Sequence, residues 1–84
     1  MDGEYSVCQF FPTGHGYEYV RRFVDAQEAV KAFEHYISSV GARIGTTQRV
    51  IITDGGDSTC VEWIFGQGIV YPPELSGITR RIKL

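Results

Sequence analysis

The chain has few of the features that mark secreted, membrane-spanning or nucleic-acid-binding proteins. It holds two cysteines and three prolines in 84 residues, and its longest aliphatic run is Val50-Ile51-Ile52, whereas a membrane span needs roughly 20 apolar residues. The acidic start, residues 1–4, lacks the apolar segment of a secretory signal. We therefore expect a cytoplasmic protein that does not enter a membrane. Cys8 and Cys60 should stay reduced there, although a disulfide remains open if their strands are neighbours.

The chain also has no large excess of positive or negative charge. Eight lysines and arginines stand against ten aspartates and glutamates, which gives a formal net charge of −2, whereas a dedicated nucleic-acid binder is usually basic. The basic cluster Arg80, Arg81 and Lys83 lies near the end of the sequence, where such clusters are typically solvated tails. Apolar residues make up 43% and aromatic residues 13%. This composition predicts one small globular domain over residues 1–84.

The clearest expected element is an amphipathic helix of about fifteen residues over 26–40. Asp25 and Glu28 have the spacing of a capping box at its start, and Gly41 suits the left-handed position that ends a helix. Apolar residues recur at intervals of three and four and form one stripe: Ala26, Ala29, Val30, Phe33, Tyr36, Ile37 and Val40. The stripe needs an apolar surface to cover it, and a sheet is the only candidate.

Strand-like segments lie on both sides of this helix. Residues 5–11 and 17–23 flank a loop with two glycines and predict a hairpin. Residues 49–53 form a β-branched run typical of a central strand, and a turn at 54–57 joins them to a strand over 58–65. The expected fold is α+β, with a single antiparallel sheet of four or five strands, β-β-α-β-β order and one amphipathic helix packed on one face.

Two segments near the end of the sequence leave alternatives open. Residues 69–71 either continue the preceding strand or pair back on it after the break at Gly66-Gln67-Gly68. Residues 78–84 predict a short terminal strand or a docking tail. Ile44, between the helix and the central strand, is expected to anchor its connection in the core.

The second strand of the first hairpin carries the candidate binding residues. Strict alternation would put Tyr17, Tyr19, Arg21 and Phe23 on one face, and Glu18, Val20, Arg22 and Val24 on the other. Neither face is apolar, so the strand is expected at an edge or as a binding surface. Rings spaced by two can stack bases while arginines neutralise phosphates, and the candidate set is Tyr17, Tyr19, Arg21, Arg22, Arg80 and Arg81. The alternatives are an ordinary half-exposed strand or tyrosines that pack under the helix, and the net acidity favours these alternatives over nucleic-acid binding.

Other polar residues give weaker signals. The loop Asp54-Gly55-Gly56-Asp57 could offer carboxylates to a cation, but it lacks the spacing of a calcium loop and is typical of a tight turn. His35 is expected on the exposed side of the helix and His15 at a loop tip, with no neighbouring catalytic partner. A Cys–His pair would need a stabilised thiolate, which nothing in the sequence indicates. We expect no metal site and no cofactor.

One stretch of the chain resembles short uncharacterised bacterial proteins. The resemblance is carried by residues 40–57, from Val40-Gly41-Ala42 to Asp54-Gly55-Gly56-Asp57, and by Cys60, Glu62-Trp63 and Phe65-Gly66. It covers most of the chain between the helix and Pro72. It implies a bacterial cytoplasmic protein, and it implies no activity.

The sequence defines no biochemical activity, so three functions stay open. The leading hypothesis is a small non-enzymatic interaction module whose partner is another protein or a second copy, joined through a sheet edge or an apolar surface around Trp63. The first alternative is single-stranded nucleic-acid binding through the aromatic and arginine strand face. The second is a small enzyme that uses Cys60 or the pair Asp54 and Asp57 in a concave pocket.

Overall fold

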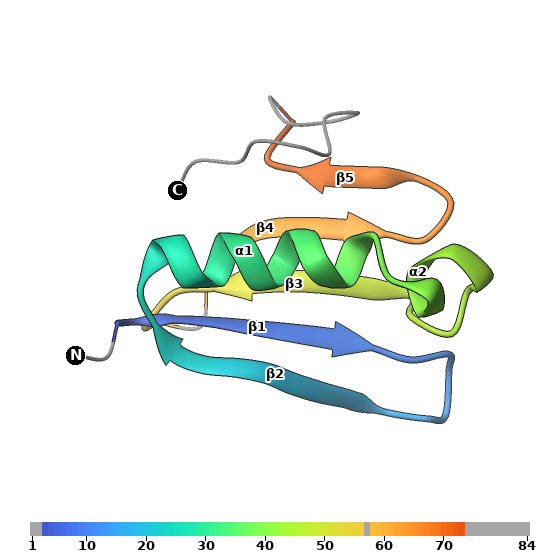
Figure 1. Ribbon diagram of the computed structural model, residues 1–84, viewed down its shortest axis with the longest axis horizontal. Coiled ribbons are helices and arrows are strands. Elements are labelled where there is room, and N and C mark those ends of the chain that lie inside the picture. The colour runs from blue at the N-terminus through green and yellow to red at the C-terminus, as the bar shows by residue number, and fades with distance from the viewer. Residues whose placement is uncertain (1–2, 57, 74–84) are drawn as a thin grey trace.

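The computed structural model describes residues 3–56 and 58–73, which form a single sheet with two helices (Figure 1). The strands are β1 (Tyr5–Phe10), β2 (Tyr17–Val24), β3 (Arg49–Thr53), β4 (Thr59–Ile64) and β5 (Gly68–Tyr71), and the helices are α1 (Ala26–Ile37) and α2 (Val40–Ile44). The five strands are antiparallel throughout, in the order β2-β1-β3-β4-β5. The expected α+β fold with one antiparallel sheet is confirmed, and the expected terminal segment 78–84 lies outside the described residues.

β3 is the central strand, as its β-branched run predicted, and β5 pairs back on β4. β2 and β5 form the two edges of the sheet. β3 separates β1, which carries Cys8, from β4, which carries Cys60, and both thiols are free. The disulfide that the sequence left open is therefore not formed.

α1 lies across one face of the sheet, over β1, β2 and β3 (Figure 1). Asp25 caps its first turn, since its side chain accepts a hydrogen bond from the Glu28 N–H at 2.8 Å. The buried side chains of the helix and the sheet form one core: Val7, Ala29, Ala32, Phe33, Ile37, Ala42, Val50, Ile52, Val61, Trp63 and Ile69. Trp63 is only 7% exposed, so its side chain belongs to this core.

The helix ends earlier than the apolar spacing predicted. Ser39 accepts a hydrogen bond from the Ala42 N–H and donates one to the Tyr36 carbonyl, and these bonds end α1 and begin α2. Serine competes for backbone groups in this way and therefore favours helix boundaries over helix interiors. Val40 consequently leaves the apolar stripe and is 62% exposed.

The left-handed position expected at Gly41 is instead found at Gly45, which ends α2 with φ of 93°. Gly41 lies within α2. Ile44, the expected core anchor of this connection, is 70% exposed. Buried Ala42 and Thr47 fix the connection in its place. No helix in the described ranges is long and apolar enough to cross a membrane.

Candidate binding surface

The face of the sheet opposite α1 is not covered by either described helix (Figure 1). Residues paired across neighbouring strands point to the same face. The register therefore places one row of side chains across all five strands of this open face: Tyr19, Cys8, Ile51, Glu62 and Tyr71. The next row begins with Tyr17 and Phe10 and continues to Arg49. The open face is thus richest in aromatic side chains at its β2 end.

These rings form an ordered array, which we call the aromatic strip and define as Phe10, Tyr17, Tyr19, Arg22 and Phe23. The Tyr17 ring lies 5.5 Å from Phe10 and meets Tyr19 edge-on at 6.0 Å. The guanidinium of Arg22 stacks 4.4 Å from the centre of the Tyr19 ring and 5.0 Å from that of Phe23. Tyr17, Phe23 and Tyr19 are nevertheless 62%, 54% and 41% exposed. The strip therefore offers apolar rings and one cation to the solvent.

A β-bulge decides which arginine belongs to the strip. Tyr19 pairs with Cys8 and Arg21 pairs with Val7, so Val20 is an extra residue in β2. Arg21 consequently shares the face of Val7, on the side of α1. Strict alternation, which grouped Arg21 with the tyrosines and placed Arg22 opposite them, was wrong for this reason.

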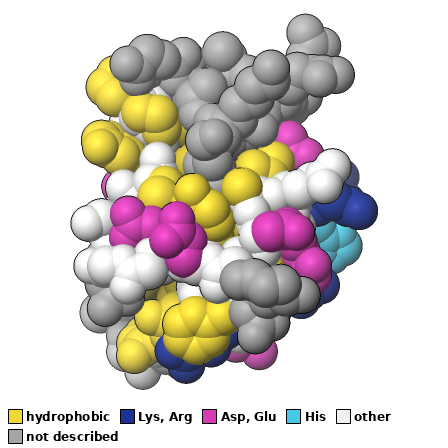
Figure 2. Space-filling model, turned by 90° about the vertical axis from the view of Figure 1, so that its left-hand side faces the viewer, with side chains coloured by type: hydrophobic (Ala, Val, Ile, Leu, Met, Phe, Trp, Pro, Cys, Tyr) yellow, Lys and Arg dark blue, Asp and Glu magenta, His cyan; other side chains and the backbone are white. Residues whose placement is uncertain are grey.

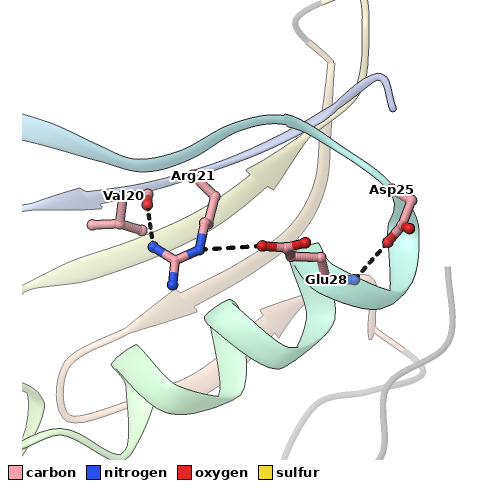
Figure 3. A network of polar contacts seen from close by, with 4 residues as sticks. All are labelled: Val20, Arg21, Asp25 and Glu28. Atoms are coloured by element: carbon pink, nitrogen blue, oxygen red, sulfur yellow. Dashed lines mark hydrogen bonds and ion pairs between the residues drawn. The ribbon is translucent and has the colours of Figure 1, made fainter. Parts of the chain in front are cut away.

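Arg21 forms an ion pair with Glu28 of α1 (Figure 3). Its Nε lies 3.6 Å from the Glu28 carboxylate of α1, and its Nη1 donates to the carbonyl of Val20 at 2.6 Å. The Arg21 and Glu28 side chains are 46% and 57% exposed, so this ion pair contributes little to stability.

Phe23 reaches the strip through a strained backbone. Its φ is 57°, a left-handed conformation that is costly for a residue with a β-carbon. The Phe23 N–H donates to the Ser6 hydroxyl, and its carbonyl accepts from the Gly3 N–H at 3.0 Å. These two hydrogen bonds stabilise the left-handed conformation of Phe23, which the sequence pattern does not predict.

The charge of Arg49, further along the open face, is neutralised by its neighbour. Its guanidinium lies 4.7 Å from the Phe10 ring centre and pairs with the carboxylate of Glu62. Phe10 and Arg49 were not among the residues predicted for a binding surface. The pairing of Phe10 with Tyr17 could have been found from the hairpin register, whereas the ion pair depends on which strands are adjacent.

A chain of polar side chains runs from two buried residues, Thr47 and Gln9, to the exposed Glu18 of β2. Thr47 donates from its hydroxyl to the Gln9 side-chain oxygen at 3.0 Å, and the Gln9 amide donates to the Glu18 carboxylate at 2.9 Å. Thr47 and Gln9 are 3% and 8% exposed. Glu18 is therefore held in place on the helix side of β2.

Two hollows lie outside the open face. The first, of about 580 Å³, lies between β2 and α1, and its lining includes both signs of charge, with Arg21 and Lys31 beside Asp25 and Glu28. The second, of about 500 Å³, is lined by Phe11, Pro12, His15, Ile44, Gly45 and Thr46. His15 is exposed in its loop and His35 on its helix, as the sequence predicted. Neither hollow contains a cysteine.

The thiols lie in surroundings that disfavour the thiolate. Burial raises the pKa of Cys8. Burial also raises the pKa of Cys60, and the negative charges of Asp54 and Glu4 raise it further. Figure 2 shows acidic side chains gathered at this end of the molecule, with hydrophobic side chains above and below them. The loop between β1 and β2, which contains His15, lies at the end of the sheet opposite to the start of β4, which contains Cys60 (Figure 1). The structure therefore does not bring Cys60 and His15 together.

The loop after β3 uses its carboxylate for the turn itself. Asp54 accepts hydrogen bonds from the backbone N–H groups of Gly56 at 2.8 Å and Ser58 at 3.1 Å. Asp57 lies outside the described residues, as do Arg80 and Arg81 of the candidate binding set. The part of the chain that the structure describes holds no group of three side chains suited to a metal ion.

Comparison with known proteins adds no family to this picture. No family model, curated protein or solved structure matches the chain. A functional conclusion therefore rests on the geometry of the surface.

Proposed function

We propose that this protein is a small non-enzymatic interaction module that binds a polypeptide partner at the aromatic strip. The observation that carries the proposal is the ring array on the open face. Tyr17 contacts Tyr19, Arg22 connects Tyr19 to Phe23, and each of the three rings is at least 41% exposed. Tyrosine and arginine are enriched at the centres of protein interfaces because rings supply large contact areas and lose little side-chain entropy. Free thiols support the further proposal of a reducing, cytoplasmic location.

A polypeptide fits the strip better than a nucleic acid. Base stacking would use the same rings, but phosphates need uncompensated positive charge nearby. Arg49 is paired with Glu62, so Arg22 is the one cation that the strip itself offers to phosphates. The chain as a whole carries a net charge of −2. Single-stranded nucleic acid is therefore the second candidate, carried by the exposed tyrosines and Arg22.

The test compares a strip variant with a matched control. A displayed peptide library is selected on the wild-type protein, and the selected peptides are measured by calorimetry on Tyr17→Ser/Tyr19→Ser and on Val40→Ser/Ile44→Ser. Both variants lose two exposed apolar side chains, but only the first alters the strip. We expect peptides to bind the wild type and the control alike, and to bind the strip variant at least about tenfold more weakly.

Two outcomes would overturn the proposal. One is a set of peptides that binds the strip variant as well as the wild type. The other is a labelled single-stranded oligonucleotide that binds at low salt, weakens steeply as salt rises and depends on the same tyrosines, while no peptide does. That result would assign the strip to nucleic acid.

A further inference from the structure

β2 presents an edge that the rest of the described chain does not cover. It has eight residues, most of them exposed, and it is an outer strand of the sheet. The Phe11 N–H bonds the Gly16 carbonyl at 2.9 Å, so the alternation of an antiparallel ladder directs the backbone groups of Tyr17 and Tyr19 away from β1. Such an edge can accept another strand through main-chain hydrogen bonds.

The charges on this edge select the incoming strand. Glu18 lies near the start of β2, and Arg21 and Arg22 follow it. Glu18 pairs with Gln9 and Arg21 with Val7, and both side chains point to the side of α1, where Glu18 contacts Gln9 and Arg21 contacts Glu28. A second β2 running in the opposite direction would bring each Glu18 to the other copy's arginines. A parallel arrangement would align like charges, which is unfavourable.

We propose that β2 pairs in antiparallel fashion with β2 of a second copy, about a two-fold axis between Tyr19 and Val20. The same patch then serves both copies, as a closed two-fold dimer requires. Glu18 of each copy meets Arg21 of the other, which releases Arg21 from its exposed pair with Glu28. The two sheets join into one, and the aromatic strips of the two copies lie next to each other across the axis.

The structure also limits the strength of this pairing. The bulge at Val20 interrupts the ladder, and the N–H and carbonyl of Phe23 are already bonded to Ser6 and Gly3. Few main-chain bonds are therefore left on this edge, and we expect a dimer with a dissociation constant on the order of micromolar. The β5 edge competes poorly because it has four residues and is followed by Pro72 and Pro73, which lack an N–H.

Complementary charge reversal tests the pairing. Glu18→Lys makes the β2 edge wholly basic, and Arg21→Glu/Arg22→Glu makes it acidic, so each variant should repel its own copy and attract the other. Sedimentation equilibrium should give a dimer for the wild type, a monomer for each variant alone and a heterodimer for their mixture. Lys31→Glu, an exposed charge reversal on α1 outside the β2 edge, is the matched control and should remain dimeric. Circular dichroism and thermal melts check that each variant is folded.

A wild type that stays monomeric at concentrations of about 100 µM would overturn the inference. Variants that still dimerise alone, or folded variants that do not associate when mixed, would overturn it as well. As a second measurement, amide exchange at Tyr17 and Tyr19 should slow as protein concentration rises, and unchanged exchange would contradict pairing at this edge. None of these outcomes depends on the proposed peptide binding, because association and amide exchange are measured on the protein alone, without any peptide.

Discussion

Replacing Thr47 by valine tests whether the hydrogen-bonded chain from the buried Thr47 and Gln9 to Glu18 stabilises the fold. Valine keeps the shape of threonine and removes only the hydroxyl that donates to the Gln9 side-chain oxygen at 3.0 Å. That oxygen belongs to a side chain only 8% exposed, so it would be left without this donor in a site that water scarcely reaches. Leaving a buried acceptor unsatisfied costs about 1–3 kcal/mol.

We therefore expect Thr47→Val to lower the free energy of unfolding by about 1–3 kcal/mol, as measured by urea denaturation. Each kcal/mol corresponds to a fall of about 4–8 °C in Tm for a domain of this size. Thr46→Val is the matched control, since Thr46 is exposed and its neighbour Thr47 is buried, and it should change stability by less than about 0.5 kcal/mol.

A double-mutant cycle separates the hydrogen bond from simple packing. Gln9→Leu removes the acceptor, so the loss of the Thr47 hydroxyl should cost less in that background than in the wild type, by about 1 kcal/mol. Equal costs in both backgrounds, or a Thr47→Val variant as stable as Thr46→Val, would refute the role assigned to this chain.

Three further changes test other parts of the fold. Gly41→Ala should destabilise by about 1–3 kcal/mol in urea denaturation, because an added Cβ would lie 2.8 Å from the Thr47 hydroxyl oxygen; Gly56→Ala, where the nearest atom lies at 3.6 Å, is the control. Asp25→Ala should cost about 0.5–2 kcal/mol through loss of the α1 cap, and exposed Gln27→Ala should cost less. Burial raises the pKa of Cys8 above its ordinary 9.0, so the folded state keeps the thiol proton to higher pH than the unfolded state does. The stabilisation gained by keeping this proton is complete below the unfolded pKa and is lost as pH rises through the folded pKa. Wild-type stability should therefore fall more steeply than that of Cys8→Ala above about pH 9.0. Parallel pH profiles for the two proteins would contradict this.

The sequence predicted those parts of the structure that depend on neighbouring residues. The Asp25 cap, the buried positions Ala29, Phe33 and Ile37 and the central strand over 49–53 all follow from local spacing and β-branching. These signals are local because hydrogen bonds within a turn, or the burial of one helix face, produce them. They were enough to predict one antiparallel sheet with a helix packed on it.

The candidate surface was predicted less well because β2 departs from the period of two at two places, at Val20 and again between Arg21 and Val24. Alternation holds from Tyr17 to Tyr19, and the extra Val20 then exchanges the faces of Arg21 and Arg22. A bulge depends on how the partner strand packs, and β2 alone carries no signal for it. The predicted end of α1 was wrong for a related reason. Ser39 could continue a helix or cap it, and its hydrogen bonds to Tyr36 and Ala42 make it a cap in this fold.

The unequal edges of the sheet bear on how the protein behaves when concentrated. A sheet that is accessible at both ends can grow by repeated addition of copies, which leads to fibres. In the described part of this chain, the edge opposite β2 is a strand of four residues followed by two prolines. Once two copies have joined through β2, each end of the combined sheet is this short edge. Assembly by strand addition should therefore stop at two chains.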